Sequence, residues 1–170
     1  MEKTYSESGY RFAFHGSLNA YKADARMFND LTAVDFVVET EKNFLFVEVK
    51  NPDNQHATIE SRRRFLKDML SPAFPYQIGG KFKDTLLRNW VCGESLNKPV
   101  ICVFILEFLD FTKSERGKLK EKLVNRIPFS LNKTEFGGKK HLERFELLSV
   151  DEFRIMFPGF SVKLEESEII

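Results

Sequence analysis

The sequence predicts an α/β fold in which a mixed central β-sheet is flanked by helices. Residues 33–39 and 44–50 are rich in Val and Phe and are bounded by polar residues, which is typical of β-strands. Residues 99–109 contain the continuous apolar run VICVFIL, which is typical of a strand covered on both faces. Amphipathic stretches with helical spacing are mixed with these strands. We therefore expect one domain over residues 1–170.

The composition is that of a folded chain with little net charge. Of the 170 residues, 42% are hydrophobic, and the formal net charge is +1. Bulk charge therefore does not indicate a nucleic-acid or membrane partner, and an anionic ligand would need a local basic patch. No apolar run approaches the roughly 20 residues that span a bilayer, and the first residues do not resemble a secretory signal. We expect a cytoplasmic protein with no membrane partner.

The first 30 residues support two interpretations. Residues 10–14 alternate between apolar and polar positions, which favours a strand. Apolar residues from Tyr10 to Phe28 are also spaced by threes and fours, which favours a helix interrupted near Gly16. Of the two, we favour a helix over much of 17–29.

Three helices are expected in the middle of the chain, at residues 57–71, 77–92 and 114–126. The sequence SPAFP should separate the first two, because proline interrupts a helix. The third should pack through Leu119 and Leu123. The side chains expected on the buried stripe of the second helix are Phe82, Leu86, Leu87 and Trp90.

The last part of the chain predicts a strand followed by a short helix. Residues 145–149 have the composition of a strand, and Ser149 and Glu152 have the spacing of a capping box. The two cysteines, Cys92 and Cys102, match no metal-ligand spacing. Cys102 lies in the long apolar run and is expected to be a small buried side chain.

Residues 33–50 predict a β-hairpin that brings two acids face to face. If the turn is symmetric about Glu41 and Lys42, the numbers of paired residues sum to 83, so that Asp35 opposes Glu48. Directly opposed residues share a face, with Cβ atoms about 4.5–5.5 Å apart. Alternation along the second strand places Lys50 on that face as well. The residues expected on the opposite face, pressed into the core, are Val34, Phe36, Val38, Leu45, Val47 and Val49.

Two opposed carboxylates repel each other, and the penalty grows as water is withdrawn. The arrangement therefore requires a positive group between Asp35 and Glu48. Lys50 is one candidate, and a divalent cation is the other. Mg²⁺ prefers hard oxygen ligands such as carboxylates and backbone carbonyls. A bound cation can polarise a phosphoryl oxygen and lower the pKa of a water molecule, while a lysine stabilises charge that develops on a phosphate.

The pattern D35-x12-E48-x-K50 resembles the PD-(D/E)XK nuclease superfamily, also called restriction-endonuclease-like. The resemblance covers residues 33–51, and the helix, buried strand and helix predicted after it follow the order of that family's core. It implies that Asp35, Glu48 and the Val49 carbonyl bind Mg²⁺, with Mn²⁺ as a substitute. Lys50 would be the catalytic lysine. The implied activity is that of a metal-dependent phosphodiesterase, in particular a DNA endonuclease.

The sequence departs from the family's pattern in three places. Val34 stands where the family's name has Pro, although many members lack that Pro. Members often carry a further acid on the first helix; Glu7 is our candidate, with Asp24 and Asp30 as rivals. Some members place a Gln on the helix after the E-x-K strand. Gln77 is the candidate for that role, although PYQIGGKF is not a close match.

The segment 62–88 is the most basic part of the chain and is a candidate contact for nucleic-acid backbone. Such contacts give sequence-independent, salt-sensitive binding. The residues assigned to this role are Arg62, Arg63, Lys67, Lys81 and Lys83. For any one of them, a position on an ordinary solvated helix face is the alternative interpretation.

Two alternatives to a nuclease remain open from the sequence. In the first, the chain keeps the fold but binds nucleic acid or a protein partner without catalysis. In the second, the hairpin is half exposed and its charged ends are merely solvated, with Lys50 bridging the two acids. Because a chain of 170 residues leaves little room for a target-recognition domain, we also expect a homodimer or a partner that delivers the substrate.

Overall fold

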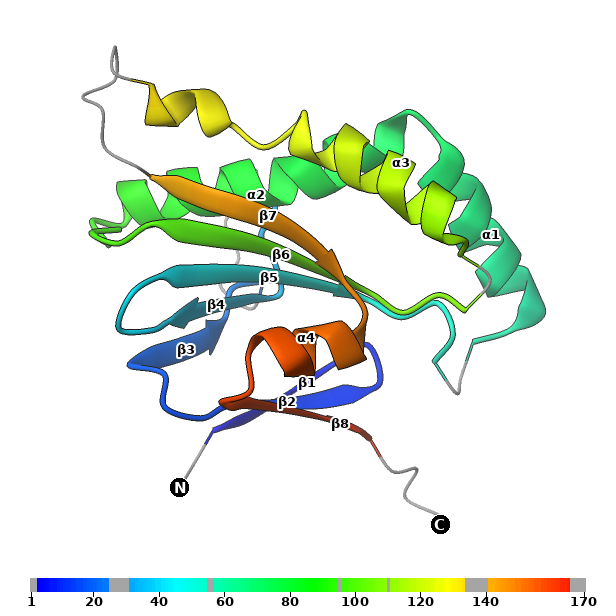
Figure 1. Cartoon of the computed structure of the whole chain (residues 1–170), viewed down its shortest axis with the longest axis horizontal. Helices are drawn as coiled ribbons and strands as arrows, with labels where there is room; N and C mark the ends of the chain where they lie inside the picture. The colour runs from blue at the N-terminus through cyan, green and yellow to red at the C-terminus, as the bar shows by residue number, and fades with distance from the viewer. Residues whose placement is uncertain are drawn as a thin grey trace.

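The structure, a computed structural model of the chain, describes residues 3–24, 31–54, 57–94, 96–109, 111–133 and 141–165. In these ranges it is a mixed α/β structure with two sheets and four α-helices (Figure 1). The strands are β1 (Thr4–Glu7), β2 (Tyr10–Phe14), β3 (Asn19–Lys22), β4 (Phe36–Glu39), β5 (Phe44–Lys50), β6 (Val100–Leu106), β7 (Leu142–Leu148) and β8 (Phe160–Leu164). The helices are α1 (Ile59–Leu70), α2 (Ala73–Val91), α3 (Lys113–Val124), α4 (Val150–Met156) and the 3₁₀ helix η1 (Phe129–Asn132).

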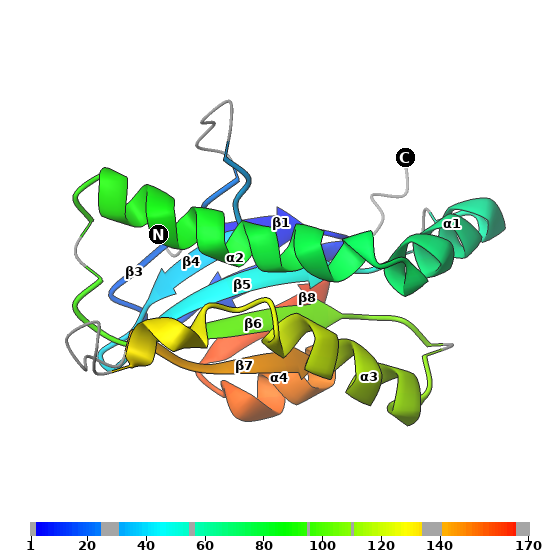
Figure 2. The ribbon, with the colours of Figure 1, turned by 90° about the horizontal axis from the view of Figure 1, so that it is seen from above.

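The larger sheet has the strand order β3-β4-β5-β6-β7. The first three strands form an antiparallel meander, whereas β6 and β7 are added in parallel. Parallel neighbours need crossover connections, which α1 and α2 provide before β6 and α3 provides before β7. Figures 1 and 2 show that these three helices cover one face of the sheet.

A second layer covers the opposite face of the larger sheet. It consists of the small antiparallel sheet β1-β2-β8 together with α4 (Figure 1). Two apolar cores result. One lies under the helices and includes Phe46, Phe82 and Phe104, and the other includes Phe12 and Phe153. Because both faces are covered, β6 is buried along its whole length, as its continuous apolar run predicted. No helix in the described parts of the chain is long and apolar enough to cross a membrane.

The predicted register of the β4–β5 hairpin is confirmed. Val37 pairs with Phe46 and Glu39 with Phe44, so that paired numbers sum to 83. The Thr40 amide donates to the Asn43 carbonyl at 2.8 Å and closes the turn. Five of the six apolar residues expected on the opposite face lie in the core beneath the small sheet: Phe36, Val38, Leu45, Val47 and Val49. The sixth, Val34, precedes β4 and packs in the core under the helices.

The helix expected over 17–29 is wrong. Residues 10–14 form strand β2, and Asn19–Lys22 form β3, which pairs with β4. Residues 25–29 of the expected helix lie outside the described residues. The spacing of the apolar residues fits both periods, and pairing with the exposed edge of β4 decides in favour of a strand.

Other element boundaries differ from the prediction by a few residues. Helix α2 begins at Ala73 rather than at 77, because Pro72 stands at the N-cap and Pro75 lies in the first turn, where a missing N–H is tolerated. Strand β7 begins three residues before the predicted start at 145. The capping box of Ser149 and Glu152 is confirmed, as is the burial of Cys102. Strand β8 was not predicted.

The buried stripe predicted for α2 is only half correct. Phe82 is fully buried, and Leu86 packs against the core. Leu87 and Trp90, by contrast, are 45% and 76% exposed. No further layer of the described chain covers these two side chains.

Candidate active site

The hairpin register brings the two predicted acids together. Asp35 directly precedes β4, and Glu48 lies near the end of β5. Their exposed fractions are 3% and 0%, so both carboxylates are withdrawn from water. The ammonium group of Lys50 lies 2.7 Å from Glu48 Oε1. The structure thus gathers Asp35, Glu48 and Lys50 as the sequence predicted.

A second ammonium group enters this site from α2. Lys81 Nζ lies 2.7 Å from Glu48 Oε1 and 3.9 Å from Asp35 Oδ1, so it bridges the two acids. The sequence predicted Lys81 as a contact for nucleic-acid backbone and gave no indication that it reaches Glu48. The Val34 amide donates to Thr85 Oγ1 at 3.1 Å, one turn further along α2, and helps to hold this face of the helix over the hairpin.

The backbone of Val49 fixes the orientation of Asp35. The Val49 amide donates to Asp35 Oδ2 at 2.6 Å, which leaves Oδ1 directed toward Lys81. The Val49 carbonyl, which the family resemblance assigns as a metal ligand, accepts a weak hydrogen bond from Ser8 Oγ at 3.4 Å. The two oxygens of Asp35 therefore have separate partners.

The two acids shift the proton affinities of the site. Burial first, and then the charge of Glu48, raise the pKa of Asp35 to about 7, although Lys50, Lys81 and the Val49 amide act in the opposite direction. Burial by itself would lower the pKa of Lys50, but Glu48 and Asp35 outweigh it and the pKa is raised. Lys50 therefore remains an ammonium ion at neutral pH, whereas Asp35 is near its midpoint. Additional positive charge near Asp35 and Glu48 would stabilise their ionised forms.

One oxygen of Glu48 has no partner among the described residues. Glu48 Oε2 is buried and makes no hydrogen bond to any described residue. Glu48 Oε1, by contrast, forms ion pairs with the ammonium groups of both Lys50 and Lys81. A buried carboxylate oxygen without a donor is costly. A divalent cation with a preference for hard oxygen ligands would satisfy it. On this observation, the donor set at Asp35 and Glu48 could hold a divalent metal ion.

Further acids extend the site on the other side of Asp35. One carboxylate oxygen from each of Glu7, Asp24 and Asp35 lies within 4.8 Å of the other two. Such a group can hold a metal ion. Glu7 was the predicted additional acid and Asp24 its rival, whereas Asp30 lies outside the described residues. Glu7 ends strand β1 instead of lying on a first helix.

Local contacts position both of these acids. The carbonyl of Ala23, next to Asp24, accepts a hydrogen bond from Arg88 Nη1 at 2.6 Å, and the Ala23 amide donates to the backbone carbonyl of Asp35 at 2.9 Å. On the other side, Lys22 Nζ lies 2.9 Å from Glu7 Oε2. Asp35 is thus shared between two groups of acids, one with Glu48 and one with Glu7.

The turn between β1 and β2 lies against the end of β5. Ser8 and Gly9 both have positive φ, 52° and 80°, as a two-residue hairpin turn requires. The Asn51 side chain donates to the Ser8 carbonyl at 3.1 Å and anchors the turn. Beside it opens a pocket of about 420 Å³, lined by Ser8, Lys50 and Asn51 and by Ser61 and Phe65 of α1 among others. Lys50 therefore lines this pocket while it contacts Glu48.

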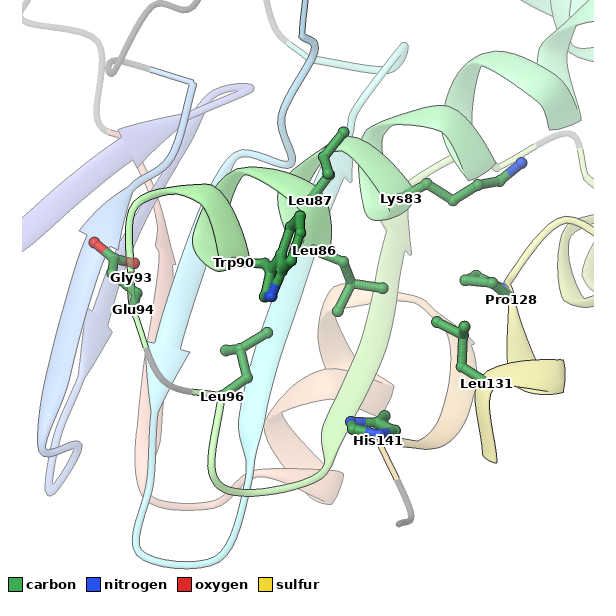
Figure 3. Close-up of a pocket in the computed structure, with 10 residues that line it drawn as sticks. All are labelled: Lys83, Leu86, Leu87, Trp90, Gly93, Glu94, Leu96, Pro128, Leu131 and His141. Atoms are coloured by element: carbon green, nitrogen blue, oxygen red, sulfur yellow. The ribbon is translucent and has the colours of Figure 1, made fainter. Parts of the chain in front are cut away.

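The other residues with predicted roles lie in different surroundings. Gln77 is exposed on α2, one turn before Lys81. Arg62 forms an ion pair with Asp53 at 2.6 Å. Arg63 and Lys67 are exposed on α1, the helix that borders the pocket beside Lys50, whereas Lys83 is exposed on α2 and lines a different groove (Figure 3).

Comparisons of the chain with protein-family models, with curated proteins and with solved structures find no match. The chemistry of the site therefore rests on its own geometry. That geometry consists of two buried acids, two lysines that share one carboxylate oxygen, and a second oxygen without a described partner.

Proposed function

We propose that this chain is a metal-dependent phosphodiesterase that hydrolyses the backbone of nucleic acid, with DNA as the expected substrate. The observation that supports it most is the buried pair Asp35 and Glu48, which meets two lysines and has a carboxylate oxygen with no described partner. The pKa of Asp35 is raised, and Lys50, which acts on Asp35 electrostatically, lines a pocket; this combination is typical of active sites. Structural ion pairs rarely leave such an oxygen unpaired.

The order of the elements also supports a restriction-endonuclease-like core. The antiparallel meander β3-β4-β5 continues into the parallel strand β6 through two helices. Asp35 directly precedes β4, and Glu48 and Lys50 lie at the end of the neighbouring strand β5. We infer that this core runs from β3 to β6. It differs from the expectation at its beginning, where β1 and β2 occupy the place of a first helix in the described residues.

Each residue of the site has a distinct role in this proposal. Asp35 and Glu48 would hold Mg²⁺, with Mn²⁺ as a substitute, and the cation would supply Lewis-acid stabilisation of the phosphoryl oxygens. Lys50, held in place by Glu48, stabilises negative charge that develops on the phosphate. The pocket beside Lys50 receives the phosphodiester. Arg63 and Lys67 on the bordering helix α1 contact neighbouring phosphates.

A second candidate function is a non-catalytic module of the same fold that binds nucleic acid or a protein partner. The bridging position of Lys81 favours it, because an ammonium group between Asp35 and Glu48 already offsets part of their charge. In that case the site is a buried ion-pair network. Titration calorimetry distinguishes the two functions, because only the hydrolase is expected to bind Mg²⁺ or Mn²⁺ at this site.

Cleavage of plasmid, single-stranded DNA and RNA in Mg²⁺ or Mn²⁺ tests the hydrolase directly. We expect the wild-type chain to cut at least one of these substrates and to stop when the metal is chelated. Lys50→Ala and Asp35→Ala should each lower the rate by about 100-fold or more, as loss of a charge-stabilising group does in other enzymes. Lys42→Ala, in the exposed turn of the same hairpin, is the control. Undiminished cleavage by both site variants would refute the assignment.

A further inference from the structure

The two lysines of the candidate active site lie closer to the solvent than its two acids do. The side chains of Lys50 and Lys81 are 32% and 25% exposed, whereas those of Glu48 and Asp35 are 0% and 5% exposed. An anion that reaches the site from solution therefore meets ammonium groups first. A cation, by contrast, has to pass an ammonium group to reach both carboxylates.

Of the two lysines, Lys81 is the one whose place a cation would take. Its ammonium group contacts both acids, at 2.7 Å from Glu48 Oε1 and 3.9 Å from Asp35 Oδ1, whereas Lys50 forms an ion pair with Glu48. The backbone at Lys81 is fixed, because its carbonyl accepts a hydrogen bond from Thr85 Oγ1 at 2.7 Å. Lys81 can therefore leave the acids by rotation of its flexible side chain while α2 stays in place.

The two ammonium groups are close enough to bind one phosphate together. Both lie 2.7 Å from the same oxygen, Glu48 Oε1, so they are at most twice that distance apart. A phosphodiester has two non-bridging oxygens, and each can accept a charge-assisted hydrogen bond from a lysine. Lys50 lines the pocket assigned above to the phosphodiester. A phosphate held by Lys50 therefore lies within reach of Lys81.

We propose that Lys81 is a second phosphate-binding lysine of the site, and that it exchanges Asp35 and Glu48 for the phosphate when a divalent cation binds. This role rests on the proposed hydrolysis, because it requires both a metal and a phosphodiester at the site. In the free protein the ammonium group is paired with carboxylates, and in the complex it is paired with phosphate. Lys81 thus has an anionic partner in both states.

The exchange of Lys81 makes the binding of metal and of phosphodiester cooperative. A divalent cation bound alone takes the acids from Lys81 and leaves its ammonium group without an anionic partner. A phosphodiester bound alone draws Lys81 away and leaves the buried carboxylates with less positive charge, which is costly. With both ligands bound, every charged group has a partner of opposite sign. By linkage, each ligand raises the affinity for the other by the same factor.

Titration calorimetry with Mn²⁺ at increasing concentrations of sodium dimethyl phosphate, a simple phosphodiester, measures this coupling. We expect the affinity of the wild-type chain for Mn²⁺ to rise at least about fivefold, relative to sodium chloride at the same ionic strength. In Lys81→Met this factor should fall at least about threefold, because only the direct attraction between metal and phosphate remains. Lys42→Met, which removes an ammonium group from the exposed turn of the hairpin, should keep the wild-type factor.

A cleavage assay separates a phosphate-binding lysine from one that only competes with the metal. Lys81→Met should lower kcat at least about tenfold at saturating Mn²⁺, whereas loss of a mere competitor would not lower it. If Mn²⁺ binds but dimethyl phosphate leaves its affinity unchanged, or the factor is equal in wild type and Lys81→Met, the role of Lys81 is overturned and the hydrolase stands. Absence of Mn²⁺ binding under every condition would contradict the hydrolase and this role together.

Discussion

Asp35 is the residue on which the chemistry of the site depends most. Burial and the charge of Glu48 raise its pKa to about 7, while its ordinary value is 3.8. The native state therefore binds more protons at Asp35 than the unfolded chain does between about pH 4 and pH 7. The sign follows from linkage: the contribution of this group to stability decreases as the pH rises through that interval. In the absence of a metal, the ionised carboxylate is a source of instability.

Asp35→Asn should therefore stabilise the protein at alkaline pH. The amide keeps an acceptor for the Val49 N–H but removes the buried charge. In urea unfolding at pH 8 with a chelator present, we expect the free energy of unfolding to rise by about 1–3 kcal/mol, and the gain should shrink at pH 5. A variant that is less stable than the wild type at both pH values would contradict the assigned electrostatics.

Lys81 occupies a position that a metal ion would need. Its ammonium group lies between Glu48 and Asp35, at 2.7 and 3.9 Å, so a divalent cation bound to both acids has to displace it. Lys81→Met keeps an apolar stem of similar length and removes the competing charge. We expect the affinity for Mn²⁺ in titration calorimetry to increase about tenfold. Lys83→Met, two residues further on the same helix and exposed, is the control. Unchanged affinity in Lys81→Met would show that Lys81 does not compete.

At the scale of elements, the sequence predicted the β4–β5 hairpin because its information is local. Alternation and a four-residue polar turn fix which residues share a face, and a shift by one residue would turn every side chain over. The convergence of Asp35, Glu48 and Lys50 followed from that register. Lys81 and Glu7 reach the same site from α2 and β1, and no local pattern encodes the packing of those elements on β4 and β5.

The N-terminal strands show the limit of periodicity. Residues 10–14 alternate as in a strand, and the apolar residues from Tyr10 to Phe28 also have helical spacing, so the sequence pattern alone could not decide between the two. The decision comes from pairing: β3 adds to the edge of β4, and β2 lies between β1 and β8. These partners are distant in sequence. The same applies to β8, which pairs with β2 across most of the chain.

Two adjacent glycines of α2 provide a test of how closely the helix packs. A Cβ added to Gly79 would lie 2.5 Å from Arg126 Cβ, whereas one added to Gly80 meets nothing within 4 Å. In denaturant unfolding, Gly79→Ala should cost about 1–3 kcal/mol through overpacking. Gly80→Ala should stabilise by about 0.5–1 kcal/mol, because alanine favours a helix. Similar effects of the two changes would contradict the packing of α2 beside Arg126.

At the scale of the whole molecule, the sheet is covered on both faces, but the helical layer is covered on only one. This explains why Phe82 met the expectation of burial and Trp90 did not. The helical period identifies apolar positions on α2, but whether a given side meets the sheet or the surface depends on which layers are present. Leu87 and Trp90 lie on a part of α2 that no described layer covers, so their apolar character does not lead to burial.

The most direct test of the central claim is a crystal of the protein soaked in Mn²⁺ and measured for anomalous scattering. We expect a peak between the carboxylates of Asp35 and Glu48, at about 2.0–2.3 Å from an oxygen of each, with the Lys81 ammonium moved away from its bridging position. A soaked crystal with no peak there and with Lys81 still bound to Glu48 would contradict the metal-dependent hydrolase.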